Sequence, residues 1–162
     1  MDGQCTVTKP PECYTDEYYQ KNLEDGQEYQ DFITEQLGRR GIMTGTFQTR
    51  KYQWEKGENL LGLEIKHDKN IKKYNRIYIE THERARRREG DYVRSGINDD
   101  KNWLFGIGDY SVFFIFGKTM LKRLRENNPN WLYWPVKDKE TSKGFCIPIE
   151  KAREIAERVI VF

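Results

Sequence analysis

A nearly continuous apolar run near the middle of the chain sets the strongest limit on its fold. Residues 110–116 read Tyr-Ser-Val-Phe-Phe-Ile-Phe, without the polar alternation of a strand that has one face in water. Such a run is typical of a strand that is buried on both faces. We therefore expect a sheet whose two faces are covered by other elements.

Helical and strand-like patterns flank this run. Apolar residues at three- and four-residue steps predict helices over about residues 25–38, 118–126 and 150–159. Alternating or β-branched segments predict strands over residues 44–52, 60–67, 76–81 and 145–149. A turn at 56–59 joins the first two strands, and the first three form a predicted meander. The order of elements predicts a mixed α/β fold, with a mixed central β-sheet flanked by helices.

The length of the chain limits the number of domains. With 162 residues the chain can form one sizeable core but not comfortably two. Mean hydropathy is low, at -0.93, but 14% of the residues are aromatic and can bury large apolar areas, which disfavours disorder. We predict an N-terminal arm over residues 1–22 and a single domain over residues 23–162.

Charge and cysteine content restrict the environment and the partners. The net charge is +2, so any attraction to nucleic acid must come from local clusters of basic residues. No apolar stretch approaches the roughly 20 residues that span a bilayer, and the N-terminus lacks a secretory layout. Cys5, Cys13 and Cys146 are too widely spaced for a zinc site or a disulfide framework. These features predict a cytoplasmic protein that does not enter a membrane.

The strand predicted over residues 60–67 carries the chemistry. Side-chain alternation places apolar residues on one face and, on the other, Gly62, Glu64, Lys66 and Asp68. A carboxylate and an ammonium two positions apart point the same way, which suits metal-dependent phosphodiester cleavage. Acid-x-Lys is expected about once by chance in a chain of this length, and it occurs twice, at 64–66 and 99–101. A solvated strand face with an ion pair is the alternative interpretation of the first.

Four blocks of the sequence together resemble the PD-(D/E)XK nuclease superfamily, in particular its small phage- and bacteria-encoded members. The blocks are residues 57–68, Arg-Ile-Tyr-Ile-Glu at 76–80, Ser-Gly-Ile at 95–97 and Thr-Ser-Lys-Gly-Phe at 141–145. The resemblance extends over about residues 26–160. It implies a restriction-endonuclease-like fold and hydrolysis of DNA with Mg²⁺, or with Mn²⁺. It also implies that Glu64 is a metal ligand and that Lys66 orients the nucleophile.

The resemblance further implies an acidic ligand just before this strand. Glu58 is the best candidate and Glu55 is its competitor. Glu58 and Glu64 are six residues apart, about 20 Å along a straight strand, so they can share a cation only if the chain turns between them. We expect that turn at residues 59–62, where Gly62 permits it.

Other acidic residues are expected to have lesser roles. Family members often carry an acid on the first helix, but this chain has Gln30 at that position. Glu28 or Glu35 could substitute for it, although we favour the interpretation of both as surface charges of the helix. Asp68 and Glu80 are predicted to support the site. The two histidines have no further ligands at zinc-binding spacing.

A cluster of arginines follows the strand predicted over residues 76–81. We predict that these residues bind the phosphates of DNA, the alternative being a solvated charged loop: Arg84, Arg86, Arg87, Arg88 and Arg94. The predicted function is a Mg²⁺-dependent DNA endonuclease. Many nucleases of this family cut both strands as dimers, so a homodimer is the expected assembly. The alternative is a non-catalytic nucleic-acid-binding or assembly subunit that retains the nuclease fold, favoured by Gln30 and by Glu in place of Asp at position 58.

Overall fold

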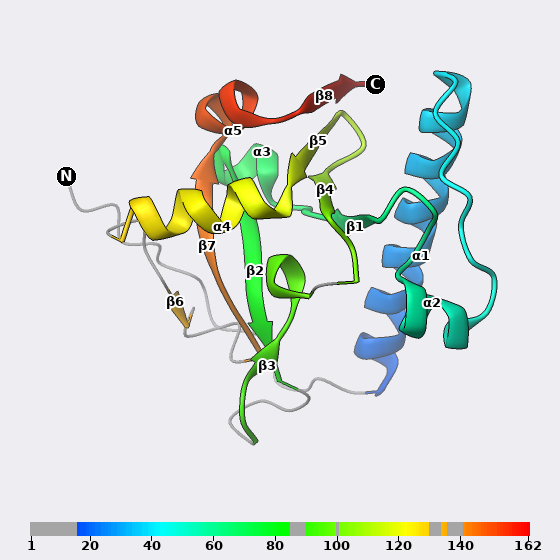
Figure 1. Ribbon diagram of the computed structural model, residues 1–162, viewed down its shortest axis with the longest axis horizontal. Helices are drawn as coiled ribbons and strands as arrows, with labels where there is room; N and C mark the ends of the chain where they lie inside the picture. Colours follow the sequence, from blue (N-terminus) through cyan, green and yellow to red (C-terminus); the bar gives the residue numbers. More distant parts are fainter. Residues whose placement is uncertain (1–15, 85–89, 100, 130–133, 136–140) are drawn as a thin grey trace.

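The computed structural model describes residues 16–84, 90–99, 101–129, 134–135 and 141–162 (Figure 1). The helices of this part of the chain are α1 (Asp16–Arg39), α2 (Arg50–Lys56), α3 (Ile71–Tyr74), α4 (Lys118–Asn127) and α5 (Ile149–Ile155), with a 3₁₀ turn, η1, over Gly96–Asn98. The strands are β1 (Leu63–His67), β2 (Arg76–Glu83), β3 (Val93–Arg94), β4 (Leu104–Gly108), β5 (Val112–Gly117), β6 (Trp134–Pro135), β7 (Ser142–Pro148) and β8 (Arg158–Val161).

The described strands form two four-stranded sheets. The first has the order β1-β4-β5-β8 and is mixed, because β1 and β4 are parallel and the other pairs are antiparallel. The second has the order β3-β2-β7-β6 and is antiparallel. The predicted mixed α/β class, with a mixed central sheet flanked by helices, is confirmed.

Strand β5 is buried on both faces, as its sequence predicts. Phe113 and Ile115 pack with Tyr29 and Ile33 of α1, and Phe114 and Phe116 pack in a second core that includes residues of β2 and β7. Figure 1 accordingly shows α1 (blue) on one side of β1, with β2 and β7 on the other side. The first sheet is therefore the middle layer of the molecule, and its edge strand β1 lies between α1 and the second sheet.

Two predicted elements have a different secondary structure. The strand predicted over residues 44–52 is wrong: Thr46 forms an isolated β-bridge with Asn59, and residues 50–52 begin helix α2. The Thr49 side chain accepts a hydrogen bond from the Tyr52 amide and caps this helix. The predicted closing helix stops at Ile155, and β8 follows it because residues 158–161 pair with β5. The predicted meander is also wrong, since β1 pairs with β4 and not with its neighbours in sequence.

The first helix is longer than its periodicity predicts. It begins at Asp16, so residues 16–22 of the predicted arm are helical, and residues 1–15 lie outside the described part. Strand β4 was not predicted. Among the described residues, no helix combines the length and the apolar character that crossing a bilayer requires.

Candidate active site

A tight turn before β1 folds Glu58 back against the strand. The Gly62 amide donates to the Asn59 carbonyl (3.0 Å), and Gly62 has a φ of +61°. The buried Asn59 side chain closes the turn by donating to the Leu63 carbonyl (2.7 Å) and accepting from the Leu63 amide (3.1 Å). The Glu58 carboxylate then accepts from the Ile65 amide (3.2 Å). The expected turn is confirmed, and it brings Glu58 beside the residue that follows Glu64.

Substituting Gly62 by alanine is expected to destabilise the protein by about 1–3 kcal/mol, measured by urea denaturation. The added Cβ would lie 2.5 Å from the Trp103 ring, at a backbone conformation that favours glycine. As a control, Gly38→Ala in α1, where nothing lies within 4 Å of the added Cβ, should stabilise the helix by about 0.5–1 kcal/mol. Equal stabilities of the two variants would contradict this account of the turn.

Alternation along β1 directs its charged residues away from α1. Leu63 and Ile65 pack in the core that α1 covers. Glu64 is only 5% exposed, although it faces the opposite side of the strand. A carboxylate at this depth requires compensating charges.

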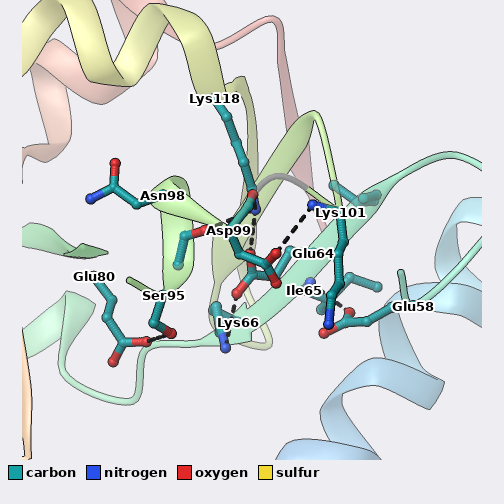
Figure 2. A network of polar contacts seen from close by, with 12 residues as sticks. Glu58, Glu64, Ile65, Lys66, Glu80, Ser95, Asn98, Asp99, Lys101 and Lys118 are labelled. Carbon is teal, nitrogen blue, oxygen red and sulfur yellow. Dashed lines mark hydrogen bonds and ion pairs between the residues drawn. The ribbon is translucent and has the colours of Figure 1, made fainter. Parts of the chain in front are cut away.

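Two lysines supply that compensation (Figure 2). The Lys66 ammonium lies 3.0 Å from Glu64 Oε1, and the Lys118 ammonium lies 2.7 Å from Oε2. Lys118 is 3% exposed and also donates to the carbonyls of Gly96 (2.8 Å) and Asp99 (3.0 Å). Lys118 is thus fixed inside the protein by three acceptors, whereas the Lys66 side chain keeps 41% of its surface exposed.

Lys118 is the site residue that sequence reasoning missed. It begins α4 and lies 54 residues after Glu64. The signal that would have revealed it is its position three residues before the buried Leu121, on the apolar stripe of α4. A lysine at a core position of a helix requires a buried partner.

The charges of the site shift one another's pKa values. Burial alone would raise the pKa of Glu64, but Lys66 and Lys118 outweigh it and hold that pKa below its ordinary value. Burial opposes the charge of Lys66, yet Glu64, Glu80 and Glu58 raise its pKa above the ordinary value. Burial raises the pKa of Glu58, against the opposing effect of Lys66. Glu64 and Lys66 are therefore ionised at neutral pH, whereas the fold disfavours the charged form of Glu58.

The variant Glu58→Gln is expected to be more stable than the wild type above pH 4.5, the ordinary pKa of this carboxyl. A folded-state pKa above the unfolded value means that folding favours the protonated group, so the wild type loses stability as the pH rises through that folded pKa. Glutamine lacks this titration and can still accept from the Ile65 amide. Thermal melting of both proteins from pH 4 to 8 tests this. A difference in melting temperature that stays constant with pH would contradict it.

A second group of polar residues lies across the cavity from Glu58. Glu80 on β2 accepts hydrogen bonds from Ser95 (2.9 Å) and from Ser142 of β7 (2.7 Å), and Ser142 also contacts the Tyr78 hydroxyl (2.9 Å). Figure 2 shows Lys66 pointing into the space between Glu64 and Glu80. The cavity has a volume of about 900 Å³, and both groups of residues line it.

The other acidic candidates differ in their positions. Asp68 lines the cavity, but its carboxylate accepts from the amides of Asn70 (2.9 Å) and Tyr78 (3.1 Å), which ties β1 to the start of β2. Glu55 is exposed on α2 and is not among the cavity residues, whereas Glu58 is. Glu28 is exposed on α1, and Glu35 is paired with Arg39 on its surface.

Gln30 reaches the site from α1. Its amide nitrogen lies 3.4 Å from Glu58 Oε2, and its side chain lines the cavity. The helix position that the resemblance singles out is therefore adjacent to Glu58 in space, although an amide and not an acid occupies it.

The predicted arginine cluster is described only in part. Arg86, Arg87 and Arg88 lie outside the described residues. Arg84 lies over the Tyr92 ring, 4.6 Å from its centroid, and Arg94 is exposed on β3.

The donor atoms at this site suit a hard cation. In the described part of the chain, no group of three or more His, Cys, Asp or Glu residues is arranged to hold a metal ion. Mg²⁺ is commonly bound by only one or two carboxylates, and water and substrate phosphates supply its other ligands. Glu58 and Glu64, on one wall of the cavity, fit that pattern.

Comparisons with protein-family models, with curated proteins and with solved structures found no match for this chain. The assignment of function therefore depends on the geometry of the site.

Proposed function

We propose that this chain is a Mg²⁺-dependent endonuclease that hydrolyses phosphodiester bonds in DNA. The observation that carries the proposal is the turn at residues 59–62, which brings Glu58 to within 3.2 Å of the Ile65 amide, between Glu64 and Lys66 in sequence. Two carboxylates and an ammonium thereby share one wall of a cavity. Surface ion pairs do not require this arrangement, whereas metal-dependent phosphodiester hydrolysis can use it to hold the cation and to stabilise the charge on the phosphate.

Each residue has a distinct role in the proposed reaction. Glu58 and Glu64 would hold Mg²⁺, which when bound neutralises charge on the phosphate and lowers the pKa of a water molecule. Lys66 is half-exposed at the cavity, so its ammonium can orient the attacking water and stabilise the charge that develops on the phosphate. Lys118 keeps Glu64 in place and ionised when Lys66 turns toward the substrate. Glu80 faces Lys66 from the other side and supports its charge.

We extend the proposal to the restriction-endonuclease-like fold and the PD-(D/E)XK superfamily. Three features support this assignment: the Glu-x-Lys pair on β1, the preceding acid delivered by a turn, and the first helix placing Gln30 beside that acid. DNA is the proposed partner, and a homodimer would present two such cavities to the two strands of one duplex.

Incubation with supercoiled, linear and branched DNA in Mg²⁺ or Mn²⁺ tests the proposed activity. We expect cleavage by the wild type that requires the divalent cation and is abolished by Glu64→Gln. Glu35→Gln, which changes an exposed acid on α1, is the matched control and should cleave normally. Cleavage that survives Glu64→Gln would contradict the site, and cleavage without added cation would contradict the metal.

Gln30 specifically favours the second candidate function, a non-catalytic nucleic-acid-binding subunit. Gln30→Glu would place a third carboxylate near Glu58, so we expect Mn²⁺ to bind about tenfold more tightly, as measured by titration calorimetry. Without the cation, repulsion between the two acids should lower the melting temperature. If neither wild type nor Gln30→Glu cleaves DNA while both bind it, the binding-subunit function is supported and the endonuclease is not.

A further inference from the structure

A row of basic side chains crosses the second sheet where β2 ends. His82 on β2 lies opposite Arg94 of β3 and opposite Lys143 of β7 in the two antiparallel pairs. Directly opposed residues in such pairs place their side chains next to each other on one face of the sheet. The three strands thus fix these three side chains as neighbours.

This row faces away from the candidate active site. The next row across the same strands includes Glu83 and Ser142, which line the cavity. Because successive residues of a strand point to opposite faces, His82 and Lys143 point away from it. A register shift between Glu80 and His82 makes this possible, since strict alternation would put those two residues on the same face.

Lys143 of this row and Arg84 lie against Tyr92, which comes just before β3. Its ring lies 4.6 Å from the Arg84 guanidinium and 3.9 Å from the Lys143 ammonium. Burial lowers the pKa of His82, and Lys143, Arg125 of α4 and Arg94 lower it further. Arg84 and Lys143 therefore lie over one aromatic ring, and Arg94 and Arg125 lie near His82 on the neighbouring strand. We call this group, namely Arg84, Arg94, Arg125 and Lys143 with Tyr92 and His82, the Tyr92 surface.

The charge of the cavity indicates that attraction to a polyanion has to come from another surface. Seven acidic residues and three lysines line the cavity, so its net charge does not by itself attract a phosphate backbone. The whole chain carries a net charge of only +2, so attraction to a polyanion has to be local.

We propose that the Tyr92 surface binds the phosphate backbone of nucleic acid, at a position separate from the cavity and on the opposite face of the second sheet. Its identification as a contact for the DNA that is cleaved rests on the proposed function. The basic side chains would contact phosphates without regard to sequence, and the Tyr92 ring offers a face on which an unpaired base can stack. Lys143, His82, Arg125 and Tyr92 extend the predicted arginine cluster onto elements that the sheet holds in place.

The test measures DNA binding by the full chain in EDTA, so that cleavage cannot occur and the result does not depend on the proposed activity. Fluorescence anisotropy with a labelled duplex is recorded over a series of salt concentrations. For Arg94→Ala and Lys143→Ala we expect about 3- to 10-fold weaker binding and a salt slope that falls by about one for each variant. In the double variant the salt slope should fall by about two.

Controls separate this contact from loss of folding and from other partners. Lys151→Ala, which removes a lysine paired with Glu154 on α5, should bind as the wild type does, and Lys143→Arg should restore binding. Unchanged affinity and slope in the double variant, with a wild-type melting temperature, would overturn the proposal. Competition by polyglutamate as strong as that by an oligonucleotide of equal charge would also overturn it, in favour of an acidic protein. Retained binding without cleavage in Mg²⁺ would instead contradict only the endonuclease.

Discussion

Replacing Lys66 by methionine is expected to lower the rate of cation-dependent DNA cleavage by about 10²- to 10³-fold, the usual cost of removing one charge-stabilising group. The Lys66 ammonium is the half-exposed member of the pair that contacts Glu64 and lies on the cavity wall, where the scissile phosphate would lie. Its loss should leave the fold intact, because Glu64 keeps its contact with Lys118 at 2.7 Å. Single-turnover cleavage and thermal melting of the same preparations measure the two effects.

Two further variants make the result specific. Lys72→Met removes an exposed lysine on α3 and should cleave at the wild-type rate. Lys66→Arg keeps the positive charge but not the compact ammonium, so it should retain activity between the wild type and Lys66→Met. A Lys66→Met protein that cleaves within threefold of the wild type would remove Lys66 from the proposed mechanism. A protein that melts several degrees lower would show instead that Lys66 is structural.

The local part of the site could be predicted from the sequence because it depends on neighbours along the chain. Strand alternation places Glu64 and Lys66 on one face, and a glycine four residues after Glu58 allows the turn that returns Glu58 to the strand. The buried strand β5 was predictable for the same reason, since its apolar run has no polar face.

The rest of the site depends on contacts between distant segments. Lys118 contacts Glu64 because β5 places the start of α4 beside η1, where the carbonyls of Gly96 and Asp99 accept the other hydrogen bonds of the ammonium. The parallel pairing of β1 with β4 likewise joins segments about 40 residues apart, so local propensity could not reveal it.

The two elements with the wrong secondary structure show how context decides between similar patterns. Residues 150–159 have an apolar stripe at helical spacing, but residues 158–161 read Arg-Val-Ile-Val, which also suits a strand. The Glu157 amide donates to the Ile115 carbonyl (2.8 Å), which draws the end of the segment to β5 as strand β8. Residues 50–56 are rich in aromatic and long side chains, but the Thr49 cap favours a helix there.

Replacing Lys118 by methionine is expected to cost about 3–5 kcal/mol of stability, the usual effect of removing one partner from a buried ion pair. The ammonium contacts Glu64 and two carbonyls, and all three acceptors would lose a donor. Urea denaturation measures the loss. Arg123→Met, which changes an exposed residue of the same helix, should stay within about 0.5 kcal/mol of the wild type.

The pH dependence of this loss identifies Glu64 as its cause. In the wild type the pKa of Glu64 lies below its ordinary value of 4.5, so its ionised form contributes stability above that pH and the contribution is lost in acid. Without Lys118, burial should raise that pKa, so the difference in free energy of unfolding between the two proteins should narrow as the pH falls from the raised pKa of the variant to the lowered pKa of the wild type. Combining Lys118→Met with Glu64→Gln should recover about 2–3 kcal/mol as coupling energy. If the difference in free energy of unfolding does not depend on pH and positions 64 and 118 are not coupled, Lys118 acts only through the carbonyls of Gly96 and Asp99.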